Sequence, residues 1–161
     1  GSVGDVLFET ALKTAELMPG TTWRLLVGGS DQADRIARLQ AQGAAAIIEP
    51  TRPDFRQMLP LASASVNMCG YNTALDLLQC GTPSVLIPFD AGNEIEQGLR
   101  ATSLAPLNGI EVLTNANLSP ENLHAALRAA ISAAPRSTDG VRFDGAQNTV
   151  TIAIEMAGQR P

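Results

Sequence analysis

The sequence is poor in basic residues, and this shortage argues against one class of partner. Lys and Arg total 11 against 16 Asp and Glu, so the formal net charge is −5, and no two basic residues are adjacent. A nucleic-acid surface needs clustered positive charge to neutralise phosphates. Aromatic residues make up only 4% of the chain, and the Ala-rich helical segments and short Val/Ile/Leu runs are typical of soluble α/β proteins.

Long apolar runs, cysteine and histidine are also scarce. No apolar stretch approaches the roughly 18 residues that cross a bilayer, and the first residues do not pair a basic segment with an apolar one as a secretory leader does. Cys69 and Cys80 are too few for a disulfide framework and lack metal-ligand spacing, and the only histidine, His124, lies far from both. We therefore expect a cytoplasmic domain with two structural thiols, a surface histidine and no metal site.

The 161 residues, 45% of them hydrophobic, suffice for one domain with a sizeable core. We expect a single domain over residues 1–161, without internal repeats. Helical periods alternate with short apolar runs, the pattern of an α/β protein with a parallel sheet. Helices are expected at Asp5 to Leu17, Asp31 to Gln42, about Asp54 to Ala62, Ser119 to about Ala133 and, as an amphipathic helix, Asp144 to Met156. Strands are expected at Thr22 to Val27, Ala45 to Ile48, Ser65 to Cys69, Ser84 to Pro88 and, at an edge, Ile110 to Leu113.

The most informative stretch is NMCGYNTALDLLQCGTPSVLIPFDAGNEIEQ, residues 67–97. Gly70 opens a turn after an apolar run, Asn72 or Thr73 can cap the helix that follows, and Gly81 ends that helix. A second apolar run then ends in a polar loop. Two neighbouring strands therefore deliver polar residues to the carboxyl edge of a parallel sheet, where such sheets bind ligands. The pattern predicts a small-molecule site.

These residues resemble the donor-binding C-terminal half of GT-B glycosyltransferases of the MurG-like type, glycosyltransferase family 28. The resemblance runs from the GSVG loop at residues 1–4 to the last helix and is densest over residues 70–101. It implies a three-layer, Rossmann-like parallel sheet, the C-terminal half of a GT-B fold. The family's first strand should lie directly before Gly1, so we expect that strand to be missing and strand edges to lack partners.

Two loops are candidates for the diphosphate and the base. A Gly/Ser loop before a helix presents free backbone N–H groups at the helix's positive end and can bind a diphosphate. The alternative is a purely structural turn, which has the same sequence pattern. The resemblance assigns this role to Ser2 and Gly4. It assigns the uracil base to Pro50 and Thr51, while Arg52 has two readings, a phosphate contact or a surface salt bridge.

The turn at Gly70 and the helix after it supply the next group of candidates. Gly70 lets the backbone approach a phosphate closely, and Asn72 and Thr73 offer short donors, in addition to ordinary turn and cap chemistry. The resemblance assigns the ribose hydroxyls to Asp76, where the family typically has Glu. The alternative for Asp76 is a partner for the helix dipole.

The loop after the second run completes the site. The resemblance assigns the donor sugar to Gln97, with Glu94 beside it, and we interpret Glu96 as part of a solvated face. The carboxylate pair of Glu94 and Glu96 also suggests a glycosidase, but the neighbouring features suit nucleotide binding. No residue is a convincing general base, because His124 lies in the wrong element.

The resemblance implies a nucleotide-sugar donor domain, for a UDP-sugar, in an enzyme that transfers a hexosyl or N-acetylhexosaminyl group to an acceptor. It implies no cofactor and no metal. The base is expected on an N-terminal acceptor-binding domain or separate subunit absent from this chain, so the chain alone should bind donor without catalysing transfer. For a lipid acceptor, that absent half would contact the inner face of the membrane. Two alternatives stay open: an enzyme like UDP-N-acetylglucosamine 2-epimerase, and a non-catalytic nucleotide-binding or regulatory module.

Overall fold

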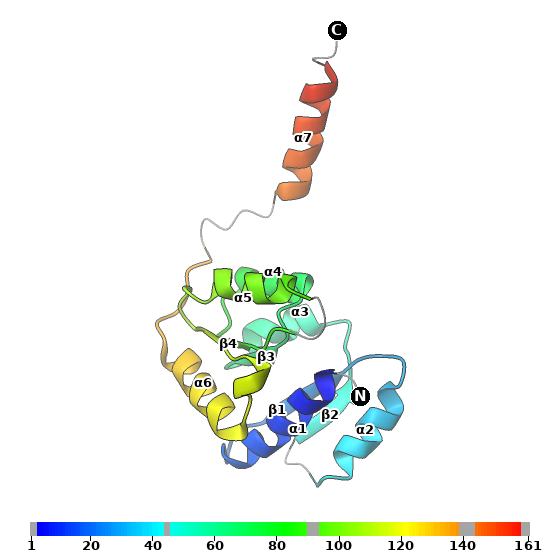
Figure 1. The fold of residues 1–161 in the computed structure, drawn as a ribbon, viewed down its shortest axis with the longest axis vertical. Coiled ribbons are helices and arrows are strands. Elements are labelled where there is room, and N and C mark those ends of the chain that lie inside the picture. Colours follow the sequence, from blue (N-terminus) through cyan, green and yellow to red (C-terminus); the bar gives the residue numbers. More distant parts are fainter. Residues whose placement is uncertain (1–2, 44–45, 90–93, 139–143, 159–161) are drawn as a thin grey trace.

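The computed structural model describes residues 3–43, 46–89, 94–138 and 144–158 and confirms an α/β fold (Figure 1). Every strand pairing in it is parallel. The strands are β1 (Trp23–Val27), β2 (Ala46–Pro50), β3 (Ser65–Asn67), β4 (Ser84–Leu86) and β5 (Ile110–Val112). The α-helices are α1 (Val3–Glu16), α2 (Gln32–Gln40), α3 (Phe55–Met58), α4 (Tyr71–Cys80), α5 (Glu96–Leu104), α6 (Pro120–Ser132) and α7 (Gly145–Gly158), and the 3₁₀ helices are η1 (Leu59–Leu61) and η2 (Asn115–Asn117).

The strands form two parallel sheets, β1-β2 and β3-β4-β5. In the first, Trp23 pairs with Ala46 and Val27 with Pro50. In the second, β4 lies between its neighbours and is buried along its whole length, while β5 pairs only with β4 and so occupies the expected edge. Within the described residues no ladder joins β1 to β3.

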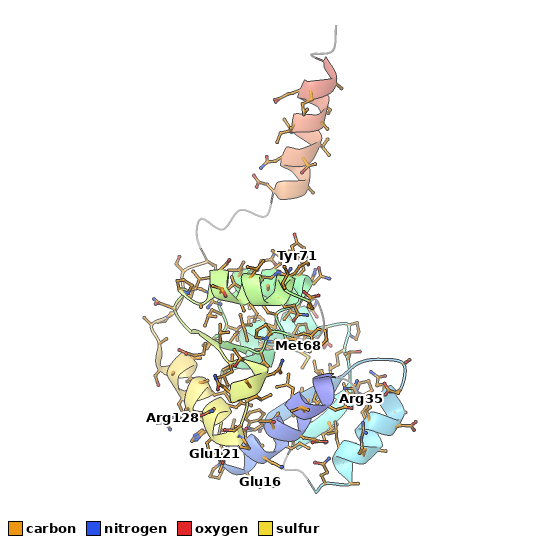
Figure 2. The ribbon with its side chains drawn as sticks, in the orientation of Figure 1. Glu16, Arg35, Met68, Tyr71, Glu121 and Arg128 are labelled. Atoms are coloured by element: carbon orange, nitrogen blue, oxygen red, sulfur yellow. The ribbon has the colours of Figure 1, made fainter. Side chains whose placement is uncertain are left out.

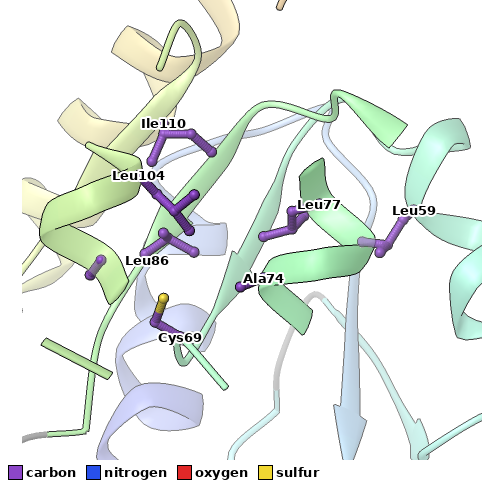
Figure 3. Packing of buried hydrophobic residues seen from close by; sticks show 8 residues of the cluster. Leu59, Cys69, Ala74, Leu77, Leu86, Leu104 and Ile110 are labelled. Carbon is purple, nitrogen blue, oxygen red and sulfur yellow. The ribbon is translucent and has the colours of Figure 1, made fainter. Parts of the chain in front are cut away.

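Alternation along β4 explains the layers around the second sheet. Successive strand side chains point to opposite faces, so Leu86 packs with Leu77 of α4 and Leu104 of α5 (Figure 3). Val85 points to the other face and packs with Leu123 of α6. Helices therefore cover both faces, as expected for a three-layer domain. α1 packs against α6 and joins the two sheets on that side.

The expected elements are present, with boundaries that differ in informative places. α1 already includes Val3 and Gly4, so the expectation that Gly4 lies in a loop before the helix is wrong. The helix expected to run to Ala62 ends at Met58, and a 3₁₀ turn follows, because Pro60 has no N–H for a helical hydrogen bond. None of the described helices is long and apolar enough to span a membrane.

The last helix has an unusual surface. The sequence predicted an amphipathic helix here, but no described residue of α7 is buried. Four of its apolar side chains are exposed, those of Val150, Ile152, Ile154 and Met156. Figure 1 shows α7 standing apart from the rest of the molecule, on the side of α4 and α5. Packing against the other described residues therefore contributes little to the stability of this helix.

Candidate functional site

Most of the described candidate residues lie at or after the carboxyl ends of β2, β3 and β4, whereas Gly4 lies in α1. The first sheet brings the loop after β1, at Gly28, to the loop after β2, at Thr51. A Cβ added at Gly28 would lie 3.2 Å from Cγ2 of Thr51, a tight contact, so the absence of a side chain at Gly28 favours the close approach of the two loops. The Thr51 N–H also donates to the carbonyl of Val27 at 3.0 Å. This region holds the residues predicted for the base and, through α1, the diphosphate.

A buried arginine, Arg35 of α2, ties α1 to the loop after β1 (Figure 2). Its side chain is 8% exposed; its Nε contacts Oδ1 of Asp5 at 2.9 Å, and its Nη1 donates to the carbonyl of Gly28 at 2.6 Å. Arg38 adds a longer contact to Asp5 at 3.4 Å. A carboxylate in the first turn of α1 would repel a diphosphate bound there, and these two arginines neutralise it. The sequence signal for this buried arginine is Leu39, an apolar residue four positions after Arg35 on the same helical face.

Replacing Arg35 with Met should lower the free energy of unfolding by about 1 to 2 kcal/mol, because the Asp5 carboxylate and the Gly28 carbonyl would both lose their contact to the buried guanidinium. Urea denaturation followed by circular dichroism measures the loss. The double variant with Asp5→Asn should recover part of it, since both charges are then removed. Equal stability of Arg35→Met and the unaltered protein would contradict the proposed tie.

In the loop after β2, Arg52 pairs with two carboxylates. Its guanidinium contacts Asp54 at 2.7 Å and Glu49 at 3.8 Å. The hydrogen bond from Arg52 lowers the pKa of the Asp54 carboxyl. Arg52 is therefore in a surface salt bridge, the second of its two predicted readings.

The turn at Gly70 is built differently from the prediction. Gly70 itself is the N-cap of α4, with extended backbone at φ −63° and ψ 151°, and α4 begins at Tyr71. Asn72 and Thr73 therefore lie within the first turn, and the expectation that one of them caps the helix is wrong. Their backbone N–H groups belong to the end of the helix that attracts anions. A phosphate contact at these residues stays a prediction.

Arg100 of α5 stabilises this turn, a role that the sequence did not reveal. Its Nη1 donates to the carbonyl of Cys69 at 2.6 Å, and its guanidinium lies 5.6 Å from the centre of the exposed Tyr71 ring. Cys69 is fully buried, and this burial raises the pKa of its thiol. Cys69 therefore has the structural role predicted for it, and Arg100 fixes the position of the turn.

Asp76 lies on the side of α4 that faces α3. Its side chain is 9% exposed, and its Oδ1 contacts Nε of Arg56 at 2.9 Å. The two residues line a pocket of about 390 Å³ together with Pro60, Gln79 and Cys80. The structure gives Asp76 an arginine partner rather than a place in the first helical turn, where the helix dipole acts most strongly.

Glu94 and Gln97 accept hydrogen bonds from backbone N–H groups around the start of α5. Oε1 of Glu94 accepts from the N–H groups of Glu96 at 2.8 Å and Gln97 at 3.3 Å, which caps the start of α5. Oε1 of Gln97 accepts from the N–H of Phe89 at 3.1 Å. The Glu96 side chain is 79% exposed, as expected for a solvated face. Sugar contacts of Glu94 and Gln97 stay predictions.

The structure thus divides the predicted site residues between two groups. Gly4, Pro50 and Thr51 lie with the first sheet, and Gly70, Asn72, Thr73, Asp76, Glu94 and Gln97 lie with the second. Ser2 is outside the described residues. Among the residues that are described, no group of three or more His, Cys, Asp or Glu side chains is placed to hold a metal ion.

Comparison with known proteins gives one family match and several relatives. The model of the family described as "Glycosyltransferase family 28 C-terminal domain" matches residues 2–139. The chain is 28% identical over 131 residues to the "UDP-N-acetylglucosamine--N-acetylmuramyl-(pentapeptide) pyrophosphoryl-undecaprenol N-acetylglucosamine transferase" of Mesorhizobium japonicum. This match covers 78% of the chain and 35% of that protein. A protein of the same name from Brucella anthropi is 30% identical over 138 residues, covering 82% and 37%. The chain therefore spans about a third of the length of these relatives.

The solved structures that share the fold include the following two. MurG of Acinetobacter baumannii matches with a TM-score of 0.72 and 16% identity, covering 96% of this chain and 47% of that one. The glycotransferase of kitacinnamycin matches with a TM-score of 0.65 and 20% identity, covering 82% and 32%. At these identities the likeness concerns the fold alone, and it confirms the expected Rossmann-like C-terminal half of a GT-B architecture.

Proposed function

Because this chain belongs to the glycosyltransferase family 28 C-terminal domain family, we propose that it binds the UDP-sugar donor of a glycosyltransferase. The transferred group is a hexosyl or N-acetylhexosaminyl group. The family match over residues 2–139 carries this proposal, since it includes every predicted donor residue. The relatives' name, an N-acetylglucosamine transferase that uses UDP-N-acetylglucosamine, supports the choice of sugar nucleotide.

The geometry suits a nucleotide diphosphate in three respects. The start of α4 presents backbone N–H groups beside Gly70, and such groups stabilise the charge that develops on a departing diphosphate. The Asp5 carboxylate, which would oppose that charge, is paired with Arg35. Asp76 offers a nearly buried carboxylate beside a pocket, where it would accept hydrogen bonds from ribose hydroxyls. The proposal needs no metal ion or other cofactor, because the helix amides take up the charge.

The remaining parts of the reaction belong outside this chain. We propose that an N-terminal acceptor-binding domain or a separate subunit supplies the general base and the acceptor site. We also propose a cytoplasmic location, since Cys69 and Cys80 are free thiols, which are typical of a reducing compartment. The acceptor in the relatives' name is a pyrophosphoryl-undecaprenol lipid, so membrane contact is assigned to the acceptor-binding part at the inner face of the membrane.

Calorimetric titration of the intact protein with UDP, UDP-N-acetylglucosamine, GDP and dTDP tests the proposal. We expect both uridine nucleotides to bind at least about tenfold more tightly than GDP and dTDP. Gln97→Ala should weaken UDP-N-acetylglucosamine severalfold and UDP itself much less, because Gln97 is assigned to the sugar. Gln147→Ala, in the exposed helix α7, is the matched control.

Two results would redirect the assignment. Absence of binding by all four nucleotides would favour a module that kept the fold and lost the chemistry. Inversion at the second carbon of a labelled UDP-sugar in the absence of any acceptor would favour an epimerase. Transfer of the label to an added acceptor would support the transferase.

A further inference from the structure

The pocket beside α4 contains a second charged group besides Asp76. Arg56, on the short helix α3, extends over the Asp76 carboxylate, with Nε at 2.9 Å from Oδ1. The Arg56 side chain is 71% exposed while that of Asp76 is 9% exposed. Both line the pocket of about 390 Å³, which lies within the usual size range of small-molecule sites. The hydrogen-bond acceptor, the Asp76 carboxylate, is therefore nearly buried, whereas the hydrogen-bond donor, the Arg56 guanidinium, is at the pocket's surface.

We propose that Arg56 and Asp76 act together as a clamp for the two neighbouring hydroxyls of a ribose, with Arg56 as a specificity-determining residue. The inference rests on the proposed function, which places the ribose at Asp76. It adds a hydrogen-bond donor, Arg56 of α3, to that site. It predicts that this residue discriminates between ribose and deoxyribose.

Hydrogen-bond chemistry supports pairing a carboxylate with a guanidinium here. A hydroxyl has one proton to donate and two lone pairs that accept. The ionised Asp76 carboxylate only accepts and the Arg56 guanidinium only donates, so together they can satisfy both functions of a sugar hydroxyl. Charge-assisted hydrogen bonds of this kind are roughly twice as strong as neutral ones.

Charge and reach favour the same arrangement. Arg56 leaves the clamp without net charge, so it does not repel the diphosphate of the same ligand. Aspartate is one methylene shorter than glutamate, and the carboxylate of Asp76 is nearly buried. A long, exposed arginine side chain compensates for this short reach by presenting its donors at the mouth of the pocket. Arg56 can turn toward a ligand at small cost, because an exposed ion partner is weakly held.

The test compares UDP with 2′-deoxy-UDP by calorimetric titration into the intact protein and into Arg56→Ala. The unaltered protein should bind UDP about tenfold more tightly than the deoxy analogue. In Arg56→Ala this ratio should fall to about twofold, mostly through weaker binding of UDP. Arg56→Lys, which keeps a charged donor without the fork of the guanidinium, should give an intermediate ratio and remains informative if the alanine variant folds poorly. Arg128→Ala, on the far helix α6, makes the same charge change and should leave the ratio unaltered (Figure 2).

The outcomes separate the clamp from the donor-domain proposal. A ratio unchanged in Arg56→Ala, with UDP still bound, would overturn the clamp alone. Tighter UDP binding by Arg56→Ala would also overturn it, because Arg56 would then compete with the ligand for Asp76. Failure of the unaltered protein to bind UDP would overturn the donor-domain proposal, and the clamp with it.

Discussion

Asp76→Asn should weaken UDP binding by about 30-fold, as expected for loss of a charged hydrogen-bond acceptor to the ribose. The asparagine keeps the shape of a side chain that is only 9% exposed, so the change removes charge and leaves packing largely intact. Calorimetric titration of UDP measures the effect, and the melting temperature shows that the variant is folded. Asp76→Ala, which removes the acceptor altogether, should bind at least as weakly.

Glu121→Gln provides the matched control for Asp76. Glu121 is an exposed residue of α6 and its neutralisation changes the net charge of the chain by the same amount (Figure 2). UDP affinity should be the same in this variant as in the unaltered protein. A loss of less than severalfold on Asp76→Ala would argue against placing the ribose at α4.

Arg136→Met should lower the free energy of unfolding by about 2 to 3 kcal/mol. This is the largest stability effect that we expect from a half-buried residue. The Arg136 guanidinium donates to the carbonyls of Asn108 at 2.8 Å, Leu77 at 3.0 Å and Thr82 at 3.2 Å. It thereby joins the end of α4 to the segments before β4 and β5. Burial lowers the pKa of this guanidinium, but arginine stays charged at any pH at which the protein folds.

Urea denaturation of Arg136→Met measures this loss, with Arg128→Met as the control. Arg128 is exposed on α6, and its replacement should change the free energy of unfolding by less than about 0.5 kcal/mol. A value of that size for Arg136→Met would show that its three carbonyl partners are equally well served by water. Arg136→Lys should retain part of the stability, since one ammonium group cannot reach all three carbonyls.

The arginines show where sequence reasoning stopped. Alternating helical and apolar segments predicted the α/β class because periodicity records which side chains are buried. The same pattern gives no sign of the partner of a long charged side chain, which depends on elements that are distant in the chain. Arg35 meets Asp5 across 30 positions, and Arg136 meets Leu77 across 59. Contacts of this kind follow only from the packing of whole elements.

The sequence by itself determined most of the helices and strands in their order, the parallel pairing of the strands, and the Gly70 turn with its polar neighbours at a carboxyl edge. It could do so because glycine, proline and hydrophobic spacing act locally on the backbone. It did not predict α5 or the division of the strands into two sheets. Tertiary structure alone decided that Gly4 is helical, that Gly70 caps α4 in place of Asn72 or Thr73, and that Asp76 faces Arg56. These features depend on which surfaces pack together, and the physical reason is that a charged or polar group takes its partner from whatever neighbouring element burial brings within hydrogen-bond distance.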